Sequence, residues 1–196
     1  MRRSTEIKRK TKETDIIVNL DIDGSGESKI ETPVGFFNHM LECFARHGSF
    51  DINLSGTGDI EVDQHHLIED CGIVLGQAFD RCLGTRQGIR RAGFFIFPMD
   101  EALATAAVDF GGRAYLQYDV SFSNPYCGSM ESGLLEDFLQ AFAANSRANV
   151  VVRIPYGRSD HHKIEAAFKA LARAVRVACE IDERNRETIP STKGVI

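Results

Sequence analysis

The chain carries one short histidine motif twice, and the two copies lie about half a chain apart. The first is "DQHHLIED" at residues 63–70, and the second is "SDHHKIEAAF" at residues 159–168. Each copy places a glutamate three residues after a pair of adjacent histidines, and together they use four of the six histidines. A motif that recurs at this distance indicates an internal duplication, which restricts the fold more than composition does.

The elements predicted around the two motifs follow the same order. In the first half, apolar periodicity predicts a hairpin, a helix, two short strands and a second helix, over residues 14–32, 35–48, 50–56, 59–63 and 65–84. In the second half it predicts a hairpin, a helix, a strand and a long helix, over residues 101–122, 132–146, 148–155 and 161–180. Asp63 and Asp160 are expected to cap the two helices that carry the histidine motifs.

The earlier helices of the two halves also align with each other. Leu41 corresponds to Leu139, and Phe44 corresponds to Phe142. We therefore expect an α+β fold that duplicates a strand-strand-helix-strand-helix unit, with the helices packed between two mixed sheets. The units are predicted to span residues 1–92 and 93–196 and to form one compact pseudo-twofold domain.

The repeated motif favours metal binding. Residues three and four apart share a helix face, so Glu69 can lie beside His65 or His66, and Glu165 beside His161 or His162. Adjacent histidines diverge by about 100° and should therefore serve two different ions. One such motif alone is more often a helix cap or a surface cluster, but two at duplicated positions favour a pair of metals of the Mn, Fe, Zn or Ni type. The candidate ligands are His39, His65, His66, Glu69, Asp137, His161, His162 and Glu165.

Basic and hydroxyl side chains in turn-like segments form a candidate phosphate site. Guanidinium, ammonium and hydroxyl donors suit phosphate oxygens, although each residue taken alone fits a solvated surface charge equally well. The candidates are Arg90, Arg91, Arg113, Lys169, Ser191 and Lys193. Lys169 lies four residues after Glu165, which places it on the metal-facing side of the last predicted helix.

Composition narrows the class of protein. A net charge of −5 gives little support to nucleic-acid binding, and no apolar run reaches the length of a membrane span. The basic segment 1–12 precedes no apolar region, so we do not expect a secretory signal. Five cysteines without a CxxC pair suggest free thiols, mostly in the core, of a cytoplasmic protein.

Taken in order, these motifs resemble the imidazoleglycerol-phosphate dehydratase family of histidine biosynthesis. The resemblance runs nearly end to end, through "KRKTKETDI", "GFFNHML", "HHLIEDCGIVLG", "GIRRAG", "MDEAL", "GRAYL", "DHHKIEAAFKALARA" and "PSTKG". It implies two Mn(II) ions per active site, held by the histidines and glutamates named above together with position 137. It also implies a phosphate pocket that includes Arg91, Arg113, Lys169, Ser191 and Lys193.

The resemblance further implies a reaction and an assembly. The reaction is dehydration of D-erythro-imidazole-glycerol phosphate to imidazole-acetol phosphate, through an imidazolate bound by both metals. Glu13 matches an acid that reaches the substrate, and we expect it to act with Glu165, His65 and His161 as the catalytic group. The implied assembly is a homo-oligomer, a 24-subunit octahedral shell with active sites at subunit interfaces.

Three positions depart from the family pattern. The family usually has histidine at Asp137, aspartate at Asn38 and glutamine at Cys43. Asp137 can still bind Mn(II) as an oxygen ligand, while Asn38 and Cys43 are expected to change the surroundings of His39. Two other functions remain open: a dinuclear metallophosphatase, and a catalytically impaired relative that binds metal without turnover.

Overall fold

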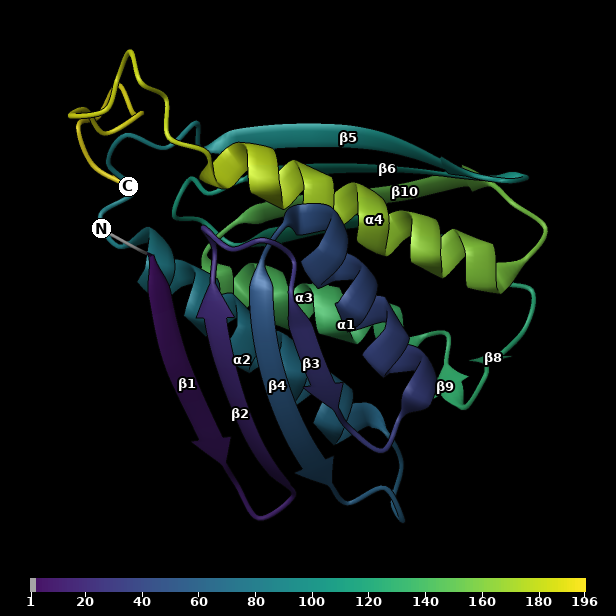
Figure 1. Cartoon of the computed structure of the whole chain (residues 1–196). Helices are drawn as coiled ribbons and strands as arrows, with labels where there is room; N and C mark the ends of the chain where they lie inside the picture. The colour runs from purple at the N-terminus through teal and green to yellow at the C-terminus, as the bar shows by residue number, and fades with distance from the viewer. Residues whose placement is uncertain (1–2) are drawn as a thin grey trace.

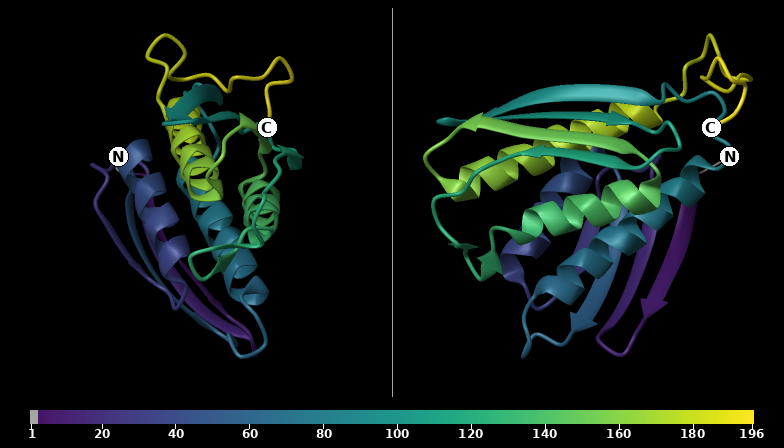
Figure 2. Two further views of the ribbon diagram at one scale, coloured as in Figure 1. Left: turned by 90° about the vertical axis from the view of Figure 1, so that its right-hand side faces the viewer. Right: turned by 180° about the vertical axis from the view of Figure 1, so that it is seen from behind.

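Two mixed sheets enclose four helices. The structure is a computed structural model that describes residues 3–196, so Met1 and Arg2 of the basic opening segment lie outside the described residues. Each sheet has four strands, and the helices fill the space between the sheets (Figures 1 and 2). This is the predicted α+β architecture.

The first sheet comes entirely from the first half of the chain. Its elements are β1 (Ser4–Lys10), β2 (Thr14–Asp21), β3 (Ser28–Glu31), α1 (Gly35–Gly48), β4 (Asp51–Gly58) and α2 (His65–Leu83). The strand order is β1-β2-β4-β3, in which β3 and β4 run parallel and the other pairs are antiparallel. The parallel pair is joined through α1, as parallel neighbours require a crossover.

The second sheet repeats this order with residues of the second half. Its elements are β5 (Ala92–Met99), β6 (Ala102–Asp109), β7 (Tyr115–Asp119), α3 (Leu134–Ser146), β10 (Asn149–Tyr156) and α4 (Asp160–Cys179). The order is β5-β6-β10-β7, with β7 and β10 parallel across α3. A small hairpin of β8 (Tyr126–Cys127) and β9 (Met130–Glu131) precedes α3. The division of the chain at residue 92 stays a prediction.

The helices cross between the two halves. α1 packs against α4, and α2 packs against α3, so each helix pair joins one half of the chain to the other. Gly72 and Gly76 allow α2 to approach α3 closely, because a Cβ atom at these positions would lie 2.6 Å from the Phe138 carbonyl oxygen and 2.8 Å from that of Phe142. Buried phenylalanines fill the centre, with the Phe79 and Phe142 rings 5.6 Å apart.

The predicted hairpins over 14–32 and 101–122 are wrong. In the first, β2 pairs with β1 and β4 while β3 pairs in parallel with β4, and the second half repeats the arrangement. The hairpins are instead β1–β2 and β5–β6. Residues 59–63 form a turn region rather than a strand. The alternation of apolar and polar residues predicts a strand, but it does not show whether that strand pairs with the strand before it or leads into a crossover helix.

The four main helices lie where they were predicted, but both caps differ. The N-cap residue of α2 is Gln64, whose side chain makes no capping hydrogen bond, while the Asp63 carboxylate before it accepts from the His65 N–H at 2.8 Å. The α4 cap is Ser159, whose hydroxyl accepts from the His162 N–H. Asp160 is instead buried in an ion pair with Lys163, at 2.9 Å. A short polar side chain therefore precedes both motifs, but at different positions.

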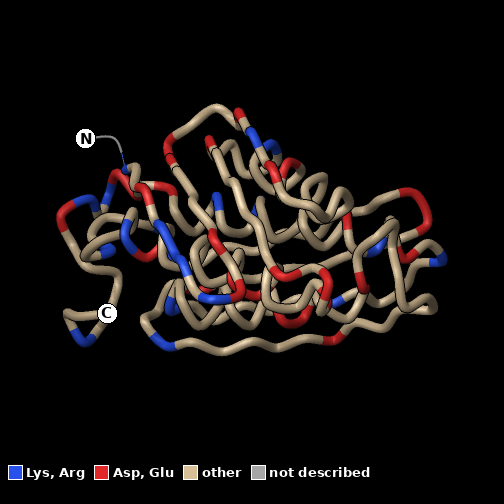
Figure 3. Tube along the Cα trace, turned by 90° about the horizontal axis from the view of Figure 1, so that it is seen from below, with Lys and Arg blue, Asp and Glu red and all other residues tan. Residues whose placement is uncertain are grey.

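The surface is mixed in charge. Basic and acidic residues alternate along the trace (Figure 3). Within residues 3–196, no helix is both long and apolar enough to cross a membrane. All five cysteines are free, and four of them are buried.

Candidate dinuclear metal and substrate site

All four main helices begin at the same end of the molecule, opposite the chain termini (Figures 1 and 2). Both histidine motifs lie in the first turns of their helices, α2 and α4. Because α2 packs against α3 and α4 against α1, residues of α3 lie beside the first motif and residues of α1 beside the second. Two related clusters result, which we call the α2/α3 cluster (His65, Glu69 and Asp137) and the α1/α4 cluster (His39, His161 and Glu165).

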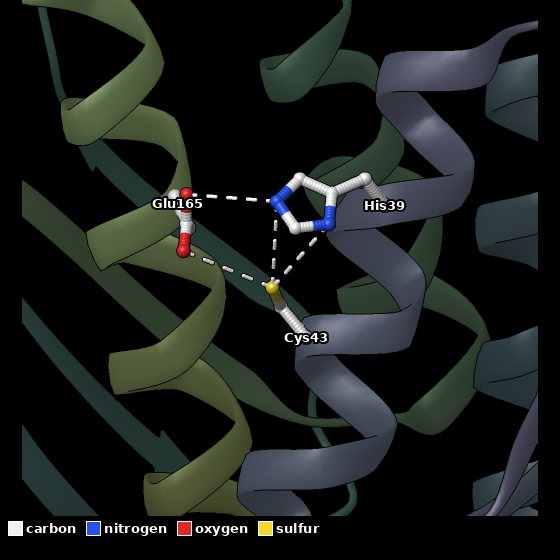
Figure 4. A group of neighbouring side chains, drawn as sticks. All are labelled: His39, Cys43 and Glu165. Atoms are coloured by element: carbon white, nitrogen blue, oxygen red, sulfur yellow. Dashed lines mark hydrogen bonds and ion pairs between the residues drawn. The ribbon is translucent and has the colours of Figure 1, made fainter.

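The α1/α4 cluster is the tighter one. The Nε2 atoms of His39 and His161 lie 3.6 Å and 3.1 Å from the same Glu165 oxygen, Oε2. Cys43 Sγ lies 3.9 Å from His39 Nε2 and 4.0 Å from Glu165 Oε1 (Figure 4). Two donors that bind one ion at about 2.1 Å are roughly 3 to 4 Å apart, so these spacings suit a shared metal.

The α2/α3 cluster is more open. His65 lies 3.9 Å from Glu69 through Nε2 and 3.9 Å from Asp137 through Nδ1. The two carboxylates therefore face opposite nitrogens of one ring, and a ring rotation is needed before all three donors face one ion. All three side chains are half-exposed, with relative accessibilities of 41–46%.

The second histidine of each motif points elsewhere, as the 100° divergence predicted. His66 Nδ1 lies 3.1 Å from Asp59, and His162 Nδ1 lies 2.8 Å from Glu101. A carboxylate at Nδ1 is the usual way in which proteins orient a histidine that binds metal through Nε2. Neither Nε2 atom has a hydrogen-bond partner among residues 3–196. Each of these two histidines therefore has its Nδ1 atom engaged by a carboxylate, which leaves its Nε2 atom available as a ligand.

Neighbouring charges and hydrogen bonds shift the pKa values of several of these side chains. The hydrogen bond to Asp59 raises the pKa of His66, and the bonds from His162 and the Ser159 N–H lower the pKa of Glu101 to about 2. Burial alone would raise the pKa of Glu165, but the Lys169 ammonium, 2.6 Å from its Oε1, holds it below the ordinary value.

The Cys43 thiol is neutral in these surroundings. Burial, reinforced by the charge of Glu165, raises the pKa of Cys43 to about 11. A nearby cation would lower this pKa, because a positive ion stabilises the deprotonated sulfur.

Five of the six phosphate candidates line a single cavity of about 790 Å³: Arg90, Arg91, Arg113, Ser191 and Lys193. The C-terminal residues after α4, which we call the tail, form one wall of this cavity, which we call the tail cavity. Arg91 holds the tail in place by donating to the Pro190 carbonyl at 2.8 Å, and it also donates to Asp109 at 2.7 Å. The sixth candidate, Lys169, lies instead in the α1/α4 cluster.

This cavity and the metal clusters of the same chain lie at opposite ends of α4. The Arg91 N–H donates to the carbonyl of Ala178 near the end of the helix. Glu165 lies in its second turn, and the rise per residue puts about 20 Å of helix between the two. Glu13 lies with Asp59 in a separate groove, 4.0 Å from His66.

Three features were missed or misplaced by sequence reasoning. Two carboxylates that orient the outer histidines were missed: Asp59, in a turn without a motif, and Glu101, which lies in "MDEAL" at a hairpin tip but was not assigned a role. Asn38 bonds Thr32 through both its amide oxygen and its amide nitrogen, so it fixes the start of α1 rather than the surroundings of His39. Cys43, in contrast, lies beside His39 as expected.

Comparison with known proteins identifies the family of the chain. The model of the imidazoleglycerol-phosphate dehydratase family matches residues 32–175. The chain belongs to this family. The matched range contains both histidine motifs and every residue of the two clusters.

Individual members of the dehydratase family agree with this assignment along the whole chain. The imidazoleglycerol-phosphate dehydratase of Koribacter versatilis is 50% identical over 196 residues, which is all of both proteins. That of Caldicellulosiruptor bescii is 51% identical over 99% of this chain and 98% of its own length.

Solved structures of the dehydratase family share the fold. The imidazoleglycerol-phosphate dehydratase of Staphylococcus aureus gives a TM-score of 0.80 at 34% identity and covers 91% of this chain and all of its own. The Pyrococcus furiosus protein, solved in complex with (S)-C348, gives 0.84 at 36% identity, over 97% of this chain and all of its own. The α+β duplication predicted from the motifs is thus the fold of this enzyme family, and the chain is a hydro-lyase of that family.

Proposed function

We propose that this chain dehydrates imidazole glycerol phosphate to imidazole acetol phosphate in the cytoplasm, using two Mn(II) ions. The observation that carries the proposal is the pair of clusters built from the two histidine motifs, each completed by a helix of the other half. Family membership supplies the reaction, and the clusters supply donors of the kind that binds Mn(II), which are imidazole nitrogens and carboxylate oxygens.

The donor sets fit two ions. His39, His161 and Glu165 would hold one ion, and His65, Glu69 and Asp137 would hold the other. His66 and His162 face away from both clusters and would complete the coordination of ions held by another copy of the chain. When bound, the ions supply positive charge that stabilises negative charge on the imidazole ring while the neighbouring hydroxyl leaves.

Glu13 is the residue that we assign to proton transfer. It lies beside His66, and its side chain is 55% exposed, so it is free to meet a substrate that enters from solvent. Glu165 is the competing candidate, but its Oε1 is paired with Lys169 and its Oε2 faces two histidines. A carboxylate engaged in this way holds a ligand position better than it moves a proton.

The substrate contacts point to an active site shared between copies. The substrate is a ring joined to a phosphate by three carbons, which is far shorter than the roughly 20 Å of helix between the α1/α4 cluster and the tail cavity. One copy would therefore bind the ring at its metal clusters while another supplies Arg91, Arg113, Ser191 and Lys193 for the phosphate. The 24-subunit octahedral homo-oligomer implied by the resemblance is our proposed assembly.

The second sheet offers a surface for such contacts. Phe94 and Ile96 on β5 and Tyr115 on β7 are 74%, 54% and 61% exposed and lie on the face turned away from the helices. Exposed apolar groups gathered on one face are typical of protein contacts, and a second copy of this chain is the occupant that the proposed assembly requires.

One assay separates the proposal from its rivals. Metal-free protein is reloaded with Mn(II) and given imidazole glycerol phosphate, and both the ketone product and inorganic phosphate are measured. We expect ketone to form with the phosphate retained. Phosphate release would favour a metallophosphatase, and metal uptake without turnover would favour an impaired relative. Asp137→His, tested in parallel, shows whether aspartate weakens the α2/α3 cluster.

A further inference from the structure

Cys43 lies beside His39 and Glu165 of the α1/α4 cluster but has no assigned role. It follows His39 by one helical turn, so both side chains leave the same face of α1. All five cysteines lie in the described part of the chain, and Cys43 alone among them is not buried. Figure 4 shows its sulfur directed at the space between His39 and Glu165.

The spacing of these donors matches the edges of a tetrahedral site. Sulfur binds zinc at about 2.3 Å and imidazole nitrogen at about 2.0 to 2.1 Å, so neighbouring ligand atoms stand roughly 3.5 Å apart. Here Cys43 Sγ lies 3.9 Å from His39 Nε2 and 4.0 Å from Glu165 Oε1, and His39 Nε2 lies 3.6 Å from Glu165 Oε2. One oxygen, one nitrogen and the sulfur also lie within 4.8 Å of one another as a group. A contraction of a few tenths of an ångström would close them around one ion.

The other cluster lacks this sulfur. The alignment that pairs His39 with Asp137 pairs Cys43 with Ala141, whose side chain offers no ligand. The α2/α3 cluster thus presents one imidazole and two carboxylates, and the α1/α4 cluster presents two imidazoles, one carboxylate and a thiol. Oxygen-rich sites suit Mn(II) and Mg(II), whereas sulfur favours softer ions such as Zn(II).

We propose that Cys43 is a metal ligand and that the two clusters consequently differ in metal preference. The α1/α4 cluster binds a thiophilic divalent ion through Cys43 Sγ, and the α2/α3 cluster keeps the preference for a hard ion. The thiol proton passes to solvent when the sulfur coordinates, as in other thiolate sites. This inference rests on the proposed function only in taking both clusters as metal sites.

Cobalt substitution tests the ligand directly. Metal-free protein is reloaded with Co(II), and the near-ultraviolet spectrum is recorded, where a sulfur ligand produces a charge-transfer band that nitrogen and oxygen ligands do not. We expect the band in the parent and its loss in Cys43→Ala and in the near-isosteric Cys43→Ser. Cys127→Ser removes a buried thiol from outside the cluster and serves as the matched control, which keeps the band. Absence of the band from the parent, or its persistence in both Cys43 variants, overturns the inference.

A Zn(II) titration against a competing chelator tests the difference between the clusters. We expect Cys43→Ala to weaken one class of Zn(II) site by at least about tenfold and to leave the other unchanged. Equal Zn(II) affinities in the parent and the variant would contradict the proposal. Both readouts are independent of turnover. If the dehydratase assignment fails, the cobalt band remains without ketone product; if the Cys43 inference fails, ketone forms without the band.

Discussion

His39 on α1 and Glu165 on α4 face each other at 3.6 Å, although they belong to different halves of the chain. In the α2/α3 cluster, the contact between the two halves is made instead by His65 on α2 with Asp137 on α3, at 3.9 Å. Each cluster therefore draws one helix from each copy of the duplicated unit. Neither half alone contains a complete cluster, so the proposed metal sites require both copies of the duplicated unit.

Metal counts in single and double variants test which residues share an ion. His39→Ala and Glu165→Gln are each expected to cost the chain one of its two Mn(II) ions, because each removes a ligand of the α1/α4 cluster. Their combination should still cost only one. His39→Ala with Glu69→Gln should cost both, because these residues serve different clusters. The counts are measured by elemental analysis of protein reloaded with Mn(II) and desalted.

His47→Ala is the control for these variants. His47 lies on the same helix as His39, at its C-terminal end, where its ring packs against Phe97 at 5.3 Å. Its loss should leave both ions in place. Loss of both ions from the double variant of His39 and Glu165 would show that the clusters are not separate sites.

The part of the site that could be predicted from sequence is the part carried by helical spacing. Helical periodicity predicts that Glu69 and Glu165 each share a face with one histidine of their own motif, but it does not say with which one. The structure pairs Glu69 with His65 and Glu165 with His161. That His39 joins the second motif rather than the first does not follow, because it depends on how α1 and α4 pack across the molecule. The strand pairing was mispredicted for the same reason. β3 and β7 do not pair with the strand before them in the chain; each pairs in parallel with the strand that follows the next helix.

Glu13→Gln should lower kcat by about 10²- to 10⁴-fold, the usual contribution of a positioned acid or base. Metal content should not change, since Glu13 lies 4.0 Å from His66 and belongs to neither cluster. Glu61→Gln, an exposed acid on the wall of the same groove, is the matched control and should retain activity. Parent-like turnover by Glu13→Gln would remove it from the mechanism and favour Glu165 or a water molecule.

Lys193→Ala should raise KM strongly while both metal ions stay bound. The residue lines the tail cavity with Arg113, remote from the clusters of its own chain, and its ammonium group contributes binding to a phosphate rather than chemistry. Steady-state kinetics and elemental analysis on the same preparation check both parts. Lys29→Ala, an exposed lysine on β3, is the control. A variant that loses metal would mean that the tail supports the clusters.

Asp160→Asn should destabilise the metal-free protein by about 3 kcal/mol, because Lys163 would be left as a buried charge without its partner. The side chains of Asp160 and Lys163 are 2% and 8% exposed and lie 2.9 Å apart. Asp119→Asn, in an exposed pair with Arg153, is the control and should cost less than about 1 kcal/mol. Urea unfolding at one fixed protein concentration measures both.

The stability lost in Asp160→Asn should depend on pH in a direction that follows from the pKa of Asp160. Burial alone would raise the pKa of Asp160, but Lys163 and the N–H groups of Asn124 and Ser123 hold it below its ordinary value. A carboxyl whose pKa is lower in the folded state stabilises the fold above its unfolded pKa of about 3.9, and this contribution disappears as the pH falls through the folded value. The stability difference between the parent and Asp160→Asn should therefore be greatest near neutral pH and shrink below about pH 4. A difference that stays constant down to pH 3 would mean that Asp160 acts through packing and hydrogen bonding rather than through its charge.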